Sequence, residues 1–218
     1  MANYVFSDLH GNLNAWRAIQ ERTNESDRLY CLGDAADRGP DGYQILKELF
    51  DDPRVIYLKG NHDDMFVEGV LKGDSGILRH WIDRCGGWST FEAWSNDSQS
   101  LDILEWLDST PEIEKIVTEK GLFLLSHAGY TPRKTPLKTL YNIDFLWGRE
   151  HFLDSWELGD LDVFVVHGHT PVSTIWADAN GPVFYADGHK INIDLGTNFT
   201  NRCALMRLDD FSFEVFRV

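Results

Sequence analysis

The residues best suited to chemistry in this sequence are acids and histidines that follow short apolar runs. Asp8 and His10 come after the run "NYVFS", and Asp34 and Asp37 come after "RLYCL". Later runs are followed by residues of the same kind, namely Asn61, His62, Asp63, His127, His167 and His169. Carboxylate, amide and imidazole groups can bind divalent metal ions or transfer protons. Because the carboxyl ends of strands in an α/β sheet meet at one crevice, residues far apart in sequence can share one site.

One of these clusters alone does not establish a metal site. The stretch "GDAADRG", which contains Asp34, Asp37 and Arg38, is also typical of a solvated turn, since Asp and Gly suit turn backbones. It does not fit a calcium-binding loop, because its acids are spaced i, i+3 rather than i, i+2, i+4. The recurrence of such clusters after successive runs is what favours a shared site.

The first third of the chain alternates between strand-like and helix-like segments, which is typical of parallel βαβ units. Apolar runs predict strands over residues 3–7, 28–32 and 54–58. Helical spacing predicts helices over residues 12–23 and 41–50. Each predicted strand ends in one of the polar clusters, as a site at the edge of a sheet requires.

The middle and the last part of the chain have different patterns. Residues 64–110 lack strand alternation and have helical spacing, for example at Leu101, Leu104 and Leu107, which predicts a helical cap or insertion. Short strands are predicted after it, over residues 113–119, 121–127, 163–168, 182–187, 191–196, 203–208 and 212–218. We therefore expect an α/β protein whose residues 1–218 form a single catalytic domain with this helical cap.

Composition narrows the classes of function. The 218 residues are 43% hydrophobic, as in an ordinary globular protein, and the formal net charge of −15 disfavours broad binding to nucleic acid. The three cysteines have no CxxC spacing, which argues against a disulfide framework or a zinc knuckle. The N-terminal residues show no leader pattern and the apolar runs are too short to span a bilayer. We expect a cytoplasmic protein that does not bind membranes.

Five clusters in a fixed order, "SDLHGN", "GDAADRG", "GNHD", "SHAG" and "GHTP", together resemble the phosphoprotein phosphatase branch of the calcineurin-like metallophosphoesterases. This branch also includes the symmetrical diadenosine tetraphosphatases. The motifs extend from residue 7 to residue 171, and "INIDLG" is similar to the family's closing strand. The resemblance implies two mixed β-sheets packed face to face as a sandwich with flanking helices, and a dinuclear metal site where the strand ends meet.

The resemblance also implies a set of metal ligands. It places Asp8 and His10 on one metal, makes Asp34 the carboxylate that bridges both metals, and completes the second with Asn61, His127 and His169. Mixed oxygen and imidazole donors suit manganese, iron or zinc better than calcium, and we expect two divalent ions, manganese first. Two such ions polarise phosphoryl oxygens and acidify a bridging water that attacks phosphorus in line.

Four further residues match the family's substrate and acid positions. Arg38 and Arg149, the latter in "LWGRE", match its phosphate-binding arginines, whose guanidinium groups form paired hydrogen bonds with phosphate. The alternative for both is a solvated charge on a loop. His62 and Asp37 match the acid pair, in which Asp37 orients the imidazolium and His62 protonates the leaving oxygen.

The substrate remains open between two classes. Pro171, where the wider superfamily has a second histidine, favours the phosphatase branch, whereas Asp63 is typical of the diadenosine tetraphosphatases. We expect a serine/threonine phosphoprotein phosphatase acting on a phosphoprotein or a phosphorylated small molecule, with a tetraphosphatase as the alternative and a non-catalytic metal-binding scaffold as the third. We assign support or packing to His167 and structural or solvated positions to His80, His151 and His189. Core positions are expected for Trp81, Trp88, Trp94 and Trp106 rather than a base-stacking platform.

Overall fold

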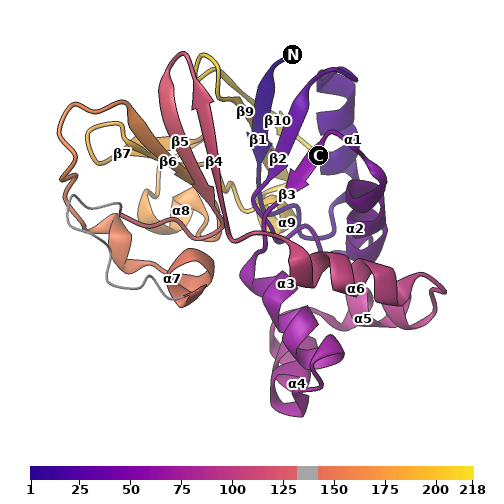
Figure 1. The fold of residues 1–218 in the computed structure, drawn as a ribbon. Coiled ribbons are helices and arrows are strands. Elements are labelled where there is room, and N and C mark those ends of the chain that lie inside the picture. Colours follow the sequence, from indigo (N-terminus) through magenta and orange to yellow (C-terminus); the bar gives the residue numbers. More distant parts are fainter. Residues whose placement is uncertain (132–141) are drawn as a thin grey trace.

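The computed structural model describes residues 1–131 and 142–218, and Figure 1 shows two five-stranded sheets with helices outside them. The first sheet has the order β10-β9-β1-β2-β3, with β1 over Asn3–Phe6, β2 over Arg28–Cys31, β3 over Val55–Tyr57, β9 over Arg202–Arg207 and β10 over Phe213–Arg217. The second has the order β4-β5-β6-β8-β7, with β4 over Ile113–Thr118, β5 over Gly121–Ser126, β6 over Val163–His167, β7 over Val183–Tyr185 and β8 over Lys190–Asn192. Each sheet contains both parallel and antiparallel pairs.

The first sheet is covered on its outer face by helices α1 (Leu13–Arg22) and α2 (Gly42–Asp51). Helix α1 begins after Asn12, whose side chain accepts a hydrogen bond from the Ala15 amide and so satisfies one free N–H group of the first turn. Trp16 and Ile19, three residues apart, lie on the same face of α1 and pack into the core against the sheet.

A second core lies between the two sheets. Strand residues alternate in direction, so Phe6 packs toward the helices while its neighbour Val5 packs toward the other sheet. Val5 shares this inner core with Phe123 and Val166 of the second sheet. The predicted fold class, two mixed sheets packed face to face with flanking helices, is confirmed.

The middle of the chain is helical, as its spacing indicates. The segment consists of α3 (Asn61–Phe66), a π-helical turn (Val67–Leu71), α4 (Ser75–Arg84), α5 (Trp88–Ser95) and α6 (Ser100–Ser109). It begins three residues before residue 64, because the Asp63 carboxylate accepts the Gly60 amide and caps α3 inside the "GNHD" motif. Trp81 is fully buried against Phe66, but Trp88 is 56% exposed and does not occupy a core position.

Two predicted strands are shorter in the structure, and three short helices accompany the second sheet. β7 covers Val183–Tyr185 of the predicted 182–187, and β8 extends over Lys190–Asn192 instead of 191–196. The residues after Asn192 lead into α9 (Thr197–Thr200). The other short helices are α7 (Asn142–Trp147) and α8 (Val172–Ile175). One or two turns are too short to produce a readable helical period, so the sequence pattern did not indicate them.

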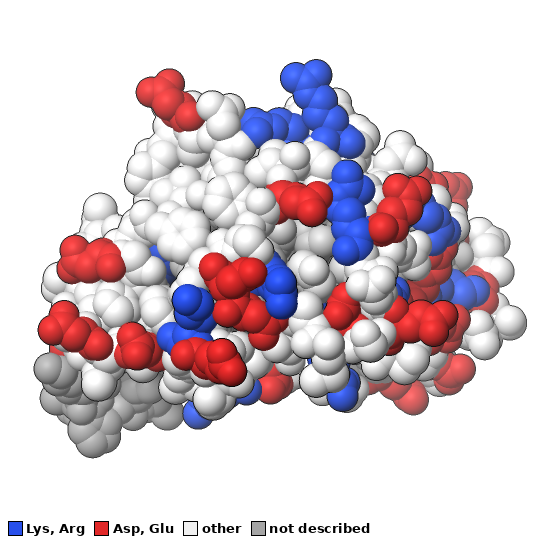
Figure 2. Space-filling model, turned by 90° about the horizontal axis from the view of Figure 1, so that it is seen from above, with Lys and Arg blue, Asp and Glu red and all other residues white. Residues whose placement is uncertain are grey.

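The two ends of the sheets differ in character. Figure 1 shows α3 and α9 at the lower edge, where β1 and β2 end. Figure 2 views the opposite end, where the described basic side chains are interspersed with acidic ones. Among residues 1–131 and 142–218, no helix has the length and hydropathy needed to cross a membrane.

Candidate metal centre

The predicted site residues lie on tight loops that follow the strands. Asp8, His10, Asp34 and His169 have positive φ angles of 52°, 45°, 54° and 67°, a backbone region that residues other than glycine seldom adopt. Glycines allow these loops to approach: a Cβ atom on Gly60 would lie 2.1 Å from Asp34 Oδ1. Such backbone conformations persist only where the surroundings enforce them, and they are concentrated at functional sites.

One group of possible metal ligands consists of Asp8, His10 and Asp34, all of which are buried. His10 Nε2 lies 3.8 Å from Asp8 Oδ1 and 3.9 Å from Asp34 Oδ2. The other ring nitrogen, Nδ1, donates to the Ala36 carbonyl at 3.1 Å. Because burial lowers the pKa of His10 to about 3, the ring is neutral and its Nε2 lone pair faces the carboxylates.

A second group joins the first through Asp34. Asn61 Oδ1 lies 2.9 Å from both His127 Nε2 and His169 Nδ1, and His127 Nε2 lies 3.4 Å from Asp34 Oδ2. The same oxygen of Asp34 therefore lies within 4 Å of an imidazole nitrogen of each group. The His62 amide donates to the other oxygen, Oδ1, at 3.0 Å and so fixes the orientation of the carboxylate.

The charges at this centre show that it suits a cation. Burial raises the pKa of Asp8, whereas the charges of His127 and His62 keep the pKa of Asp34 well below its usual value despite burial. Burial would lower the pKa of His127, but the Asp34 carboxylate raises it to about 10. A proton on His127 thus supplies positive charge where two buried carboxylates meet. These His and Asp groups could hold metal ions in place of that proton.

His62 and Asp37 form a buried pair beside this centre. His62 Nδ1 donates to Asp37 Oδ2 at 2.7 Å, and His62 Nε2 points toward Asp34 at a distance of 4.0 Å from Oδ2. Burial lowers the pKa of His62, but the carboxylates of Asp34 and Asp37 outweigh it and the pKa is raised. Arg38 Nη2 lies 2.9 Å from His62 Nε2, to which it donates when the imidazole is neutral, so the guanidinium group lies at the mouth of the same site.

The family model described as calcineurin-like phosphoesterase matches residues 3–204. The chain belongs to the calcineurin-like phosphoesterase family. The family predicted from the five motifs is confirmed, and the chain is a hydrolase that acts on phosphoric esters.

Two curated relatives and one solved structure are similar to this chain. The chain is 24% identical to serine/threonine-protein phosphatase 2 of Escherichia coli over 217 residues, which cover 94% of this chain and 92% of that protein. It is 28% identical over 137 residues to a symmetrical bis(5'-nucleosyl)-tetraphosphatase of Buchnera aphidicola, covering 61% of this chain and 46% of that protein. A solved structure of a candidate diadenosine tetraphosphatase superposes with a TM-score of 0.71 at 17% identity, covering 99% of this chain and 92% of that one.

In this calcineurin-like phosphoesterase, the helical segment holds the loop of Asp37 and Arg38. Trp81 of α4 donates from Nε1 to Asp37 Oδ2, the oxygen that also accepts from His62. The Thr90 hydroxyl accepts the Asp37 amide at 3.0 Å, and the Gly86 carbonyl accepts the Arg38 amide at 2.9 Å. The sequence predicts only a core position for Trp81. A buried indole requires an acceptor for its N–H, but the sequence does not tell which one.

The Asp63 carboxylate holds the loop of Asp34 through hydrogen bonds. Its Oδ2 accepts hydrogen bonds from the Asp34 amide at 3.1 Å, the Gly60 amide at 2.8 Å and the Tyr57 hydroxyl at 2.9 Å. Burial and the nearby charge of Asp34 raise the pKa of Asp63 to about 7. The sequence places Asp63 among the clustered ligand-type residues and makes it a mark of substrate class, whereas its contacts connect two of the motif loops.

Arg149 and His167 lie farther from the buried ligands. Arg149 is exposed after α7, and its charge contributes, after burial and His127, to lowering the pKa of His169 to about 2. His167 is fully buried, and its Nε2 lies 2.8 Å from the Tyr185 hydroxyl. Its packing position agrees with the expected support role, and His151 is likewise buried.

Proposed function

We propose that this phosphoesterase is a metal-dependent phosphomonoesterase, and specifically a serine/threonine phosphoprotein phosphatase. The observation that carries the proposal is the single Asp34 oxygen located between the imidazoles of His10 and His127. A carboxylate oxygen placed in this way could be shared by two metal ions, as in two-metal phosphatases. The phosphoprotein class is supported by the E. coli phosphatase, which aligns over nearly the whole of both chains.

The proposed metals are two divalent ions, manganese first and iron or zinc as alternatives. Asp8, His10 and Asp34 would hold one ion, and Asp34, Asn61, His127 and His169 would hold the other. Ligand-type atoms of Asp8, Asp34 and His127 lie within 4.8 Å of one another, and so do those of His10, Asp34 and His62. When bound, the ions supply an acidified water and polarise the phosphoryl oxygens. The carbonyls of Ala36 and Leu32 accept the Nδ1–H groups of His10 and His127 and so orient both Nε2 atoms toward Asp34, where they would serve as ligands.

Arg38 and Arg149 would bind the phosphoryl group. Because Arg38 donates to His62 Nε2 in the substrate-free arrangement, a phosphate that attracts its guanidinium group releases this nitrogen. His62 can then carry a proton on Nε2 and donate it to the leaving oxygen, while Asp37 holds the ring through Nδ1. Arg149, which is exposed and whose charge acts on His169, would also contact the phosphate.

Hydrolysis of dinucleoside tetraphosphates is the second candidate function. It is supported by the Asp in "GNHD" and by the tetraphosphatase of Buchnera aphidicola, which is 28% identical over the aligned 137 residues. That alignment covers 46% of the relative, whereas the alignment to the E. coli phosphatase covers 92% of it. The broader alignment is why we place the phosphoprotein substrate first.

The two functions can be separated by comparing kcat/KM of the manganese-loaded protein on a phosphoserine peptide and on diadenosine tetraphosphate. The proposal predicts the higher value for the peptide. Adenine recognition is tested by competition: under the proposal, diadenosine tetraphosphate and tripolyphosphate inhibit peptide hydrolysis equally. Hydrolysis of the tetraphosphate with no turnover of phosphopeptides would replace the first function by the second.

A further inference from the structure

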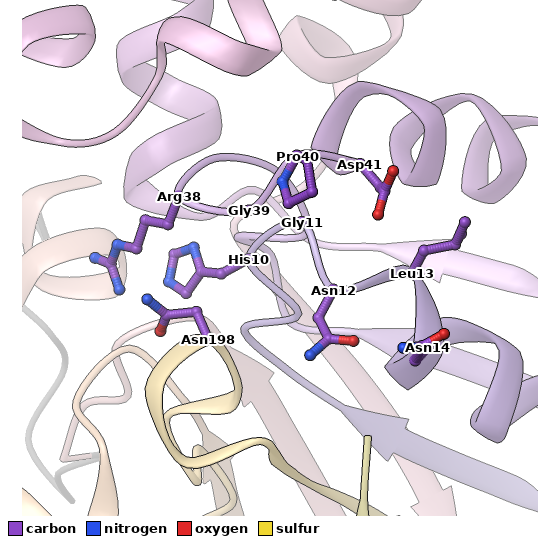
Figure 3. Close-up of a pocket in the computed structure, with 10 residues that line it drawn as sticks. All are labelled: His10, Gly11, Asn12, Leu13, Asn14, Arg38, Gly39, Pro40, Asp41 and Asn198. Atoms are coloured by element: carbon purple, nitrogen blue, oxygen red, sulfur yellow. The ribbon is translucent and has the colours of Figure 1, made fainter.

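A pocket of about 270 Å³ opens beside the candidate metal centre (Figure 3). His10 and Arg38 stand at its inner end, and Asn12, Asn14 and Asp41 line the side formed by the start of α1 and the loop before α2. A group attached to a phosphate at the metal centre could extend directly into this pocket, because the two share His10 and Arg38.

Asn198 of α9 completes the wall opposite α1. Figure 3 shows its side chain directed toward His10 and Arg38. Its Oδ1 atom is buried and has no hydrogen-bond partner among the described residues. A buried amide oxygen without a partner costs free energy, so a rotation of the Asn198 side chain that brings this oxygen into the pocket, where a ligand can donate to it, is favoured.

The short helix that presents Asn198 is fixed at both ends. Asp194 Oδ1 accepts the Gly196 amide at 2.7 Å before the helix, and the Thr200 hydroxyl donates back to the Leu195 carbonyl at 2.9 Å. Gly196 and Asn201 on either side both have left-handed backbones, which close the turn tightly. The backbone at Asn198 is therefore held in place before a ligand arrives.

The side chains that line the pocket indicate which chemical group it can bind. Of its lining residues only Arg38 carries a fixed positive charge, and none has an aromatic side chain apart from the imidazole of His10. A second nucleotide would need cations for its phosphates and an aromatic face for its base. Neutral amides instead complement the N–H and C=O groups of a peptide main chain. The pocket is also smaller than the usual ~300–1,000 Å³ of small-molecule sites.

We propose that this pocket binds the main chain beside the phosphorylated residue of a polypeptide, and that Asn198 Oδ1 accepts one of its N–H groups. The inference rests on the proposed phosphoprotein phosphatase function and names a residue that recognises its substrate. The reacting phosphate would be held by Arg38, while Asn198 contacts only the peptide.

The test compares Asn198→Ala with the wild type on a phosphoserine peptide and on p-nitrophenyl phosphate, which has no main chain. Loss of one hydrogen bond should lower kcat/KM for the peptide about 3- to 10-fold, through KM, and leave p-nitrophenyl phosphate unchanged. The matched control is Asn96→Ala, which removes an exposed amide that donates to the Glu92 carbonyl in a different groove. The control should change neither substrate.

Peptides N-methylated at the phosphoserine or at either neighbouring residue identify the donor. In the wild type, one of the three methyl groups should lower kcat/KM for the peptide by the same factor of about 3 to 10. In Asn198→Ala, that methyl group should cause no further loss. Equal losses on both substrates, or methylation penalties that persist in Asn198→Ala, would overturn the inference. Neither outcome would contradict phosphopeptide turnover by the wild type. If the wild type hydrolyses p-nitrophenyl phosphate and diadenosine tetraphosphate but no phosphopeptide, the proposed function fails first, and the inference with it.

Discussion

Replacement of Trp81 by Phe tests whether the helical segment takes part in the chemistry by holding Asp37. The substitution keeps an aromatic ring stacked on Phe66, at a centroid distance of 4.7 Å, and removes the indole N–H that donates to Asp37 Oδ2. Asp37 Oδ1 already has no partner among the described residues. Among the described residues, His62 is then the side chain that still donates a hydrogen bond to the carboxylate of Asp37.

The expected loss follows from the strength of that hydrogen bond. Hydrogen bonds to charged groups contribute about 1.5–3 kcal/mol, and about 1.4 kcal/mol is a tenfold change in rate. Only part of this hydrogen-bond free energy is lost in the transition state, because a less restrained Asp37 still orients His62. We therefore expect kcat on a phosphoserine peptide to fall about tenfold with KM unchanged. On p-nitrophenyl phosphate, whose leaving group needs no proton, we expect less than about a threefold loss.

The assay measures kcat and KM on both substrates at full metal loading, with thermal unfolding in parallel. Trp94→Phe is the matched control, because Trp94 lies in the same helical segment and its Nε1 donates to the Ser100 carbonyl at 2.8 Å instead. The control should retain normal kcat on both substrates. Equal losses on the two substrates, or an equal loss in Trp94→Phe, would refute the reasoning and reduce Trp81 to a packing residue.

Three further predictions concern the proposed site. His62→Asn should lower phosphoserine-peptide turnover about 10²- to 10⁴-fold and p-nitrophenyl phosphate distinctly less; equal losses would exclude His62 as the leaving-group acid. Arg38→Ala should lower kcat/KM about 10²-fold or more, and Arg149→Ala should chiefly raise KM and weaken inhibition by inorganic phosphate; unchanged phosphate inhibition in both variants would remove them from the site. Manganese affinity should rise with pH between 6 and 8, about tenfold per pH unit for one released proton, because the raised pKa of His127, about 10, means that the metal must displace its proton. Titration calorimetry that detects no proton release would contradict this assignment.

The sequence motifs were sufficient to predict the family, the fold class and the convergence of the buried site residues. Each strand-end cluster could be read locally, and the rule that strand ends meet at one crevice brought together residues as distant as Asp34 and His169. The contact of Trp81 with Asp37 could not be read in this way, since it depends on how α4 packs across a loop 44 residues earlier in the chain. The position of Asn198 depends on a four-residue helix that has no periodic signal.

The proposed dinuclear site depends most directly on Asp34, the carboxylate that two metal ions would share. Asp34→Asn retains the size of the side chain and removes its charge, and the measurement is metal content per chain by mass spectrometry together with turnover. We expect two manganese ions per chain in the wild type, and loss of both metal and turnover in Asp34→Asn. Asp37→Asn, a matched change in a residue not assigned as a ligand, should retain both ions. An Asp34→Asn protein that binds two ions and turns over substrate at the normal rate would contradict the dinuclear site.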